Sequence, residues 1–533
     1  MRKENQPIVR RSLLLIVAFA ATACAPAAPD QWTKQEADHY LNLQFASHNA
    51  DASKGIVAGI AYPFAVHSGM KVLQQGGTAA DAAITASLTQ IAMTAGATVS
   101  YAGVIDVVYY DSASDKVYTL NAAYNTVKDE MDPLTIPSPG EPSGRTALVP
   151  GFMAGVQALH DRFGKLPFAA LFRPAIWIAE HGMPFSRELD SWLTQSKDFI
   201  GRLPETRKVF TKPDQQFYKQ GDWFRQPALA ETLKKVAAQG SQYMYKGDWA
   251  HHFVEAVERE GGKMTMDDLA SYQAMWTEPL RMQYRGYEVV SLGSPNYGGE
   301  IMLDGLKFAQ TVDFKKQLHY SQSPDSLADI VQIGRAALDK MNADFVPRSA
   351  HSSAIIAVDE HGNVASVLHS INTSLWGSTG IFVDGVSIPD SGAINQRVIL
   401  AAGPGTRLFE GMNPLIVLKQ GTPYLASSAV GGGLHQVTLQ NLINVLDFGM
   451  DVASAVVQPN TYGAMWTNDR IEAADSGFST TVLDGVRARG QQIEVVKDYA
   501  QTGYWVGVQI RPLLVHKLGG ATNQKIPGFV EGY

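Results

Sequence analysis

The stretch SAHSSAIIAVDEHGNVASVLHSINTSLWGSTG, residues 349–380, decides the fold of this chain. Ser352 and Ser353 stand immediately before a run of five apolar residues, 354–358. The turn sequence Asp-Glu-His-Gly-Asn follows, and then a second strand-like run, 364–371, which carries further hydroxyl groups. Short apolar runs bounded by turn residues predict β-strands. The sequence therefore places two adjacent hydroxyl groups at the start of a strand.

The order of elements around this stretch predicts an α/β (α+β) fold built in layers. Before it we expect an Ala-rich helix over 79–88, paired strands at 104–110 and 117–120, helices at 151–163 and 166–182, and a mostly helical region, 228–345, interrupted by one strand at 284–291. After it we expect short strands to about residue 426 and a helix over 437–448. No change of composition marks the 351/352 junction, so a cut there would leave two pieces of one fold.

Composition narrows the function classes. The chain has 533 residues, of which 45% are hydrophobic and 18% charged, and its net charge is −7. This indicates a globular protein without the basic footprint of a nucleic-acid-binding or anionic-membrane-binding protein. The 13 histidines show no metal-ligand spacing, and no Gly-x-Ser-x-Gly elbow is present. We therefore predict no metal and no cofactor.

The N-terminus is predicted to be a targeting segment. Basic residues precede a short apolar run, 13–21, which is too short to span a membrane as a mature helix. The only cysteine, Cys24, follows Ala-Thr-Ala and resembles the end of a bacterial lipobox, so we predict a signal peptide over 1–24 and lipidation at Cys24. A plain signal peptide is the alternative. Residues 25–54 are expected to be a tether, and the protein is expected in the periplasm, anchored to the envelope.

Several further motifs occur in a fixed order. They are GGTAADAA (76–83), VPG (149–151), RFGKLP (162–167), PAI and AEHG (174–182), GG to DDLASY (261–272) and YRGYEV (284–289). In this order they resemble the gamma-glutamyltransferases, of the N-terminal-nucleophile hydrolase superfamily, over about residues 55–478. The resemblance implies a four-layer αββα sandwich that cuts itself into a large piece, 55–351, and a small piece, 352–533, which stay together as a heterodimer.

The resemblance also implies a nucleophile. The family motif TTHxSVVDxxGN aligns without gaps from Ser352 onward, with Ser353 as the neighbouring hydroxyl. Ser352 would attack the carbonyl of His351, and its freed α-amine, with a pKa near 8, could then act as general base. The family's usual Thr is replaced by Ser and its third-position His by Ala354. A start at Ser349 would require a three-residue shift.

Two more segments complete the implied catalytic set. Ser370 and Asn372 fall on the family's T-x-N pair, where the hydroxyl contacts the nucleophile's amine and the Asn binds substrate. Gly431 and Gly432 fall on the catalytic Gly-Gly, whose backbone N–H groups would stabilise an oxyanion. The plain alternatives are a polar strand edge and a simple turn. A phosphate loop is excluded because no Lys-Ser/Thr follows.

The substrate-binding positions depart from the family. Asn121 stands where an Arg holds the glutamyl carboxylate, Asp390 reaches an amine-binding position only with a one-residue shift, and Gly411 with Glu410 replaces a Ser-Ser pair. An amide cannot replace a bidentate guanidinium. Arg145, Arg397 or Arg407 would have to supply the missing cation.

Three functional hypotheses follow. The first is an exported, self-processing amidohydrolase or acyltransferase that forms an acyl-Ser352 ester, with altered acyl specificity. It would pass the acyl group to water, or less readily to an amine. The second is ordinary γ-glutamyl chemistry. The third is an uncleaved, non-enzymatic, ligand-binding envelope protein. The expected partners are an amide substrate and the chain's own cleaved piece, with the membrane reached only through the lipid anchor.

Overall fold

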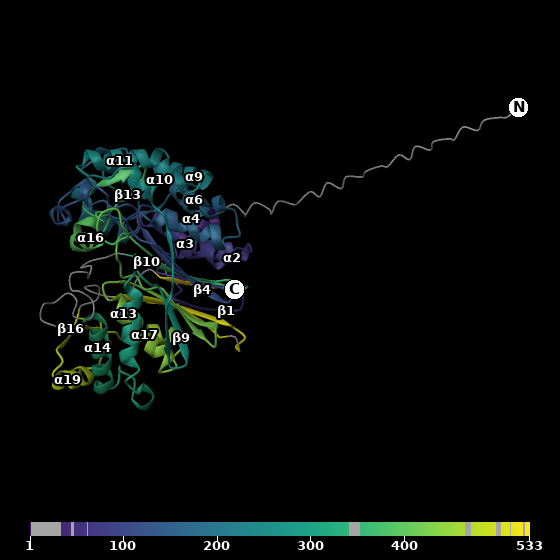
Figure 1. Ribbon diagram of the computed structural model, residues 1–533, viewed down its shortest axis with the longest axis vertical. Coiled ribbons are helices and arrows are strands. Elements are labelled where there is room, and N and C mark those ends of the chain that lie inside the picture. The colour runs from purple at the N-terminus through teal and green to yellow at the C-terminus, as the bar shows by residue number, and fades with distance from the viewer. Residues whose placement is uncertain are drawn as a thin grey trace. The chain divides into compact units, whose positions relative to one another are not determined.

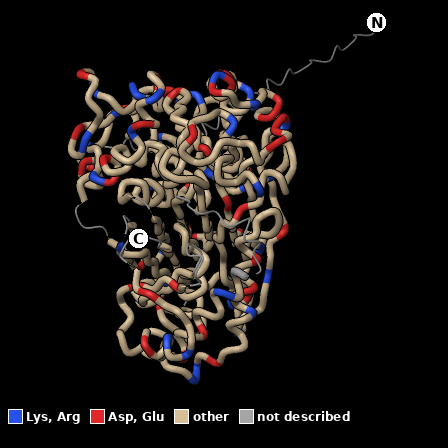
Figure 2. The backbone as a smooth tube through the Cα atoms, turned by 90° about the vertical axis from the view of Figure 1, so that its left-hand side faces the viewer, with Lys and Arg blue, Asp and Glu red and all other residues tan. Residues whose placement is uncertain are grey.

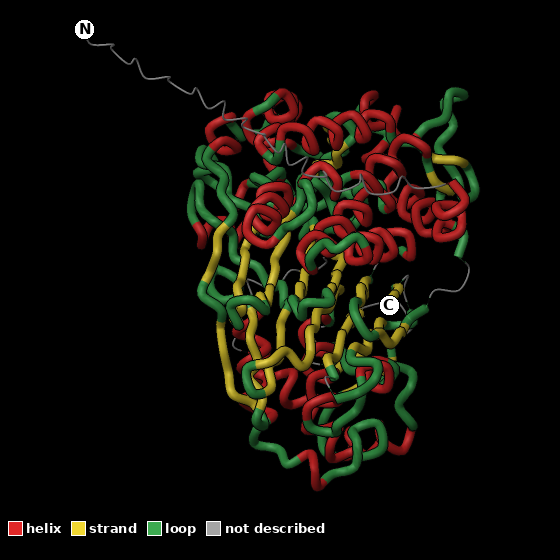
Figure 3. Tube along the Cα trace, turned by 90° about the vertical axis from the view of Figure 1, so that its right-hand side faces the viewer, coloured by secondary structure: helices red, strands yellow, loops and turns green. Residues whose placement is uncertain are grey.

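Two antiparallel sheets of seven strands lie face to face in a computed structural model of the chain, with helices outside each sheet (Figures 1 and 3). The fold described below belongs to the unit that contains residues 32–533. Besides Met1, the structure describes residues 34–43, 47–60, 62–339, 352–463, 471–496, 503–511, 513–525 and 528–533.

The first sheet has at its centre the hairpin formed by residues 352–370. Its strands, in spatial order, are β20 (Phe529–Gly532), β2 (Ile56–Gly59), β10 (Ser352–Val358), β11 (Val364–Ser370), β3 (Val104–Asp111), β4 (Lys116–Ala122) and β7 (Met275–Thr277). The predicted pair β3–β4 is confirmed, the two strands predicted at 354–358 and 364–371 form the pair β10–β11, and β11 also pairs with β3. The apolar run of β10 is continuous because both faces of this sheet are buried.

The second sheet is built from strands on both sides of the hairpin in sequence. Its spatial order is β1 (Asn49–Ala52), β19 (Leu518–Thr522), β18 (Gly503–Ile510), β15 (Thr422–Gly431), β14 (Leu415–Lys419), β9 (Tyr287–Ser291) and β8 (Leu280–Tyr284). Because β14 runs antiparallel to β15, the start of β14 and the end of β15 lie at the same edge of the sheet.

Helices form the two outer layers (Figure 1). On the side of the first sheet lie α2 (Pro63–Gln74), α3 (Ala79–Met93), α4 (Phe152–Phe163), α6 (Arg173–His181), α9 (Pro227–Gln239), α10 (Gln242–Lys246) and α11 (Asp248–Arg259). On the side of the second lie α13 (Gly298–Ala309), α14 (Pro324–Asp339), α17 (Leu434–Leu446) and α19 (Thr480–Ala488). The predicted four-layer αββα sandwich is confirmed.

Three buried cores separate the four layers. Alternate residues of β10 enter different cores, because successive side chains of a strand point to opposite faces. Ile355 packs with the helices beside the first sheet, whereas Ile356 packs between the sheets against residues such as Ile416. A third core, which includes Leu442, lies between the second sheet and its helices. This alternation decides which side chains of β10 and β11 can face a site between the sheets.

Asp81 connects the motif at residues 76–83 with the motif at residues 162–167. It follows Thr78, the N-cap of α3, in a capping box, and its Oδ2 accepts the Thr78 N–H at 3.0 Å. The same oxygen accepts the backbone N–H groups of Lys165 at 2.9 Å and Leu166 at 3.1 Å. One buried carboxylate therefore joins the start of α3 to the loop after α4.

Three expectations about local structure were wrong. The strand expected at 284–291 is the end of β8 and all of β9, joined at Arg285-Gly286, where both residues have positive φ as a two-residue hairpin turn requires. The helix expected at 166–182 is two helices, α5 (Phe168–Leu171) and α6, with Pro174 in the first turn of α6.

The folded part of the chain also begins before residue 55, within the segment expected to be a tether. Helix α1 (Lys34–Leu41) is held by Glu36, which contacts His67 and Lys71 of α2, and β1 pairs with β19. The partners of both elements lie far along the chain, so local composition could not indicate them.

Charged residues of both signs are interspersed over the outer helices and loops, while the strands between them carry few (Figure 2). No helix within the described ranges is long and apolar enough to cross a membrane.

Candidate active site

Ser352 and Ser370 face each other at one end of the central hairpin. They are register partners in the β10–β11 pair, and the Ser352 hydroxyl donates a hydrogen bond to Ser370 Oγ at 3.0 Å. Ser370 is 1% exposed, and Ser352 is partly buried. Both share the face of Ala354 and Leu368, which pack between the two sheets. The hairpin thus directs the predicted nucleophile and its predicted helper into the space between the sheets.

Ser353 lies on the other face of β10. It is buried and pairs with His369, whose Nε2 lies 2.5 Å from Gln90 Oε1 on the helical side. Burial lowers the pKa of His369 to about 3, so this imidazole is neutral. The structure therefore does not bring Ser353 together with Ser352 and Ser370, because side chains alternate along a strand.

Asn372 adopts a left-handed backbone conformation, with φ of 50°, directly after β11. Its N–H donates to Ser370 Oγ at 2.9 Å, and its Nδ2 donates to Glu410 Oε2 at 3.1 Å. The residue thus links the hydroxyl pair to a carboxyl group, as its predicted place beside the nucleophile requires.

Glu410 and Asp106 form a buried carboxyl pair that the sequence analysis did not identify. They are 4% and 0% exposed, and the two groups hydrogen-bond each other. Asn296 Nδ2 donates to Asp106 Oδ2 at 2.9 Å. Burial raises the pKa of Asp106 to about 6, and burial together with the charge of Asp106 raises the pKa of Glu410 well above its usual range. The available signal was Asp106 itself, an acid within the apolar run of β3.

Asn121 contacts this pair and the guanidinium of Arg407. Its Nδ2 donates to Glu410 Oε1 at 3.4 Å, and Arg407 Nη1 donates to Asn121 Oδ1 at 2.7 Å and to its backbone oxygen at 2.9 Å. The remaining Arg407 nitrogens donate to Asn125 Oδ1 and to the backbone oxygen of Gln273. Arg407 is therefore the cation that lies beside the predicted carboxylate-binding position.

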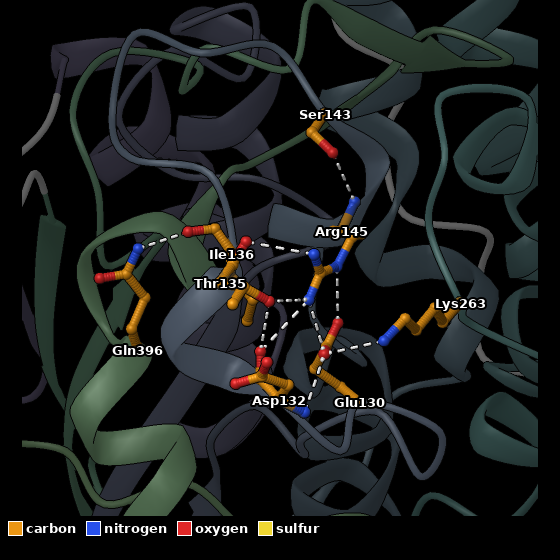
Figure 4. Close-up of polar contacts among 8 residues, drawn as sticks. All are labelled: Glu130, Asp132, Thr135, Ile136, Ser143, Arg145, Lys263 and Gln396. Carbon is orange, nitrogen blue, oxygen red and sulfur yellow. Dashed lines mark hydrogen bonds and ion pairs between the residues drawn. The ribbon is translucent and has the colours of Figure 1, made fainter.

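The other two arginines considered for that role lie elsewhere. Arg145 forms a bidentate ion pair with Glu130, with Nε–Oε2 and Nη2–Oε1 distances of 2.9 and 2.8 Å, and also donates a hydrogen bond to the Thr135 hydroxyl (Figure 4). Lys263 approaches the same Glu130 at 3.0 Å (Figure 4). Arg397 is exposed on α16 (Gln396–Ala402). Neither shares a hydrogen bond with Asn121, whose contacts are to Arg407, Glu410 and backbone.

The predicted oxyanion glycines connect β15 to α17. Gly431 ends β15 with φ of 90°, and Gly432 precedes the N-cap of α17. Close to them His435 Nε2 donates to the backbone oxygen of Gly411 at 2.9 Å. Burial lowers the pKa of His435 to about 4, so the ring is neutral. Because Gly411 follows Glu410, this contact brings the first turn of α17 to the same end of the sandwich as Asn372.

That location suits anion stabilisation. The backbone N–H groups at the start of a helix have no partner within the helix, and the helix dipole favours negative charge there. We therefore retain Gly431 and Gly432 as oxyanion candidates, and add His435 as a residue that holds Gly411 against α17.

The Asp390 carboxylate forms hydrogen bonds within the neighbouring loop. Its Oδ1 accepts the Thr373 hydroxyl at 2.6 Å, and its Oδ2 accepts both the N–H and the hydroxyl of Ser378, at 2.9 and 2.5 Å. The carboxylate is 2% exposed. These hydrogen bonds hold residues 373–378 in place. Among the described residues, no contact joins Asp390 to Ser352, Ser370 or Asn372.

Some predictions lie outside the described residues. These are the lipidation at Cys24, the scissile carbonyl of His351 and the alternative start at Ser349. Among the residues that are described, no group of three or more His, Cys, Asp or Glu is placed to hold a metal ion.

Comparison with known proteins assigns the family. The family model of gamma-glutamyltranspeptidase matches residues 65–345 and 339–524. The chain belongs to the gamma-glutamyltranspeptidase family. It is therefore an enzyme of the N-terminal-nucleophile hydrolase type, as the motif order predicted.

Relatives of two kinds are similar to it. The glutathione hydrolase proenzyme of Escherichia coli is 25% identical, over 92% of this chain and 93% of that protein. The Acylase ACY 1 proenzyme of Pseudomonas sp. strain SE83 is also 25% identical, over 83% of this chain and 88% of that protein. The crystal structure of a cephalosporin acylase from Bacillus halodurans covers 92% of this chain and 98% of its own, with a TM-score of 0.80 and 21% identity, which shows the shared fold.

Proposed function

We propose that the protein is a self-processing amidohydrolase or acyltransferase that acts through an acyl-Ser352 intermediate and has an acyl pocket different from that of a glutathione hydrolase. The observation that carries the proposal is the 3.0 Å hydrogen bond between the Ser352 and Ser370 hydroxyls, at the first residue of β10 in a chain of this family. The names of the similar relatives, which include both hydrolase and acylase proenzymes, support an amide substrate.

The first reaction is cleavage of the chain before Ser352. Ser352 Oγ attacks the carbonyl carbon of His351, the peptide C–N bond breaks, and the acyl group moves from nitrogen to oxygen as an ester. Ser370 Oγ, which accepts the Ser352 hydroxyl, orients that attack. Water then cleaves the ester, leaving a carboxylate on His351 and a free α-amine on Ser352.

The second reaction uses the freed Ser352. Its α-amine takes the proton from its own hydroxyl, which attacks the substrate amide and forms an acyl ester, while the leaving amine is protonated. Backbone N–H groups at Gly431 and Gly432 stabilise the tetrahedral oxyanion. Water then releases the acid. We propose hydrolysis ahead of transfer, because no acceptor site is identified in the sequence.

The altered pocket is supported by Asn121, Glu410 and Arg407. Arg407, the cation beside Asn121, donates four hydrogen bonds to Asn121, Asn125 and Gln273, so most of its N–H groups are engaged within the protein. Export and lipidation at Cys24 remain proposals that rest on the N-terminal sequence, and so does a periplasmic location on the envelope.

The test is whether the chain cuts itself. Denaturing gels and intact mass are measured for the full chain beside Ser352→Ala, with Ser353→Ala as the matched control on the opposite face of β10. We expect wild type and Ser353→Ala to release residues 352–533, which are 182 of 533 residues and about 20 kDa of 57.8 kDa, while Ser352→Ala stays whole. A wild-type chain that stays whole after prolonged incubation would refute the proposal and favour a ligand-binding protein.

A further inference from the structure

The buried carboxyl pair lies three hydrogen bonds from the predicted nucleophile. Ser352 donates to Ser370 Oγ, Asn372 N–H donates to the same oxygen, and Asn372 Nδ2 donates to Glu410 Oε2. Glu410 Oε1 in turn accepts Asn121 Nδ2. Glu410 therefore lies between the two amides that the family resemblance assigns to substrate binding.

The pair carries one negative charge near neutral pH. Two carboxyl groups in hydrogen-bond contact cannot both ionise readily when buried, so they share a proton. The higher pKa of Glu410 leaves the proton on Glu410 and the charge on Asp106 above about pH 6. The facing charged group is Arg407, which acts on both acids. The phenols of Tyr124, Tyr272 and Tyr297 also face Glu410, and burial raises their pKa values, so they stay neutral.

This arrangement fixes the amide of Asn372. The Asn372 group that meets Glu410 is the NH₂, which donates to Oε2 at 3.1 Å, while Glu410 also hydrogen-bonds Asp106. The amide oxygen then points elsewhere. Among the described residues, none donates a hydrogen bond to Asn372 Oδ1. The described part of the chain thus leaves an acceptor without a donor on the residue whose N–H binds Ser370.

We propose that Glu410, with Asp106, selects amide substrates whose acyl group carries an ammonium or other N–H donor and no carboxylate on the Asn372 side of the nucleophile. The inference rests on the proposed function and names the acyl class for it. A donor would satisfy Asn372 Oδ1 and approach the negative pair, which is favourable in a buried site.

A substrate carboxylate would be opposed by the same groups. It would add a second negative charge beside the pair. Among the described residues, the cation that acts on both acids is Arg407, and its hydrogen bonds already go to Asn121, Asn125 and Gln273. Four of the five guanidinium N–H groups are thus engaged, so a carboxylate could not form a bidentate contact without displacing bonds that hold Arg407 in place.

Four p-nitroanilides test donor and carboxylate separately. Butyryl carries neither group, 4-aminobutyryl the ammonium, glutaryl the carboxylate, and γ-glutamyl both. For the processed wild-type enzyme we expect kcat/KM to be highest for 4-aminobutyryl, at least tenfold above γ-glutamyl, and lowest for glutaryl. The advantage of 4-aminobutyryl over butyryl should fall below about pH 6, where Asp106 is protonated and the pair loses its charge.

The double variant Asp106→Asn/Glu410→Gln, which removes the charge of the pair, should reduce both the ammonium advantage and the carboxylate penalty at least tenfold and remove the change near pH 6. The matched control is Glu472→Gln, another buried glutamate with a raised pKa, on β16 (Glu472–Ala474), which should leave the four ratios unchanged. A preference of wild type for γ-glutamyl or glutaryl, or the same ratios in the double variant, would overturn the proposal.

A binding measurement separates this inference from the proposed function. Wild-type protein, with its cleavage state recorded by intact mass, is titrated with 4-aminobutyramide and with L-glutamine, which differ by the carboxylate, and the thermal midpoint is followed. We expect 4-aminobutyramide to raise the midpoint and glutamine to raise it less. Equal shifts, a reversed order or no shift with either compound would overturn the acyl class, even if the chain cleaves itself. A failure to cleave would overturn the proposed function alone.

Discussion

Replacing Ser370 by alanine should slow the cleavage before Ser352 without preventing it. The change removes the acceptor of the 3.0 Å hydrogen bond from the Ser352 hydroxyl and leaves the fold of β11 intact. A neutral hydrogen bond of this kind contributes about 0.5–1.5 kcal/mol net. If the whole contribution acts in the transition state, cleavage slows by about 2- to 12-fold.

The control lies four residues earlier on the same strand and face. Ser366 is also fully buried, and its hydroxyl donates to the backbone oxygen of Ser427 at 2.9 Å, so Ser366→Ala removes a comparable bond away from the nucleophile. Freshly purified precursor of each variant is incubated, and the fraction of intact chain is followed by mass spectrometry. Cleavage of Ser370→Ala at the rate of Ser366→Ala would refute the view that Ser370 orients the attack.

Two predictions concern stability. Asp81→Asn should lower the free energy of unfolding by about 1–3 kcal/mol, because Asp81 Oδ2 accepts three backbone N–H groups and an amide offers them one neutral oxygen. Urea unfolding measures the change, with Asp484→Asn at an exposed position as the control. Equal unfolding midpoints for the two variants would contradict the prediction. The pKa of His435 is about 4 in the folded protein and about 6.5 in the unfolded chain. Between these values the unfolded chain binds the extra proton, so the free energy of unfolding falls as the pH falls, by up to about 3 kcal/mol. His435→Gln should therefore lose less stability than wild type between pH 6.5 and 4.5, and parallel curves would show that this histidine contributes nothing.

Elements that depend on neighbours in sequence could be predicted. The β10–β11 hairpin follows from two apolar runs around Gly362-Asn363, and the helix after Thr78 follows from its capping residues and alanines. The hairpin at Arg285-Gly286 was missed, because arginine is not a residue that signals a left-handed turn position. Helix α1 and strand β1 were missed because they depend on partners outside their own stretch of sequence, namely His67 and Lys71 of α2 for α1 and β19 for β1.

Some residues of the candidate site could likewise be predicted from the sequence, and others could not. Ser352, Ser370 and Asn372 could be located because they belong to one hairpin, whose register brings them together. Glu410 could not be recognised as a partner of Asp106, since one residue precedes β14 and the other is inside β3. Their contact, and the raised pKa values that follow from it, exist only once the two sheets are packed.

The strand order has a consequence for the two products of cleavage. In the first sheet, β2 comes from the part of the chain before residue 352, but it lies between β20 and β10, which both come from the part that starts at residue 352. In the second sheet, β1, β9 and β8 come from before residue 352, and β19, β18, β15 and β14 come from after it. A cut at this point would leave two polypeptides interleaved through shared backbone ladders rather than docked across a surface. They could not separate without unfolding, so no subunit exchange is expected between differently labelled molecules, and dilution would not dissociate them.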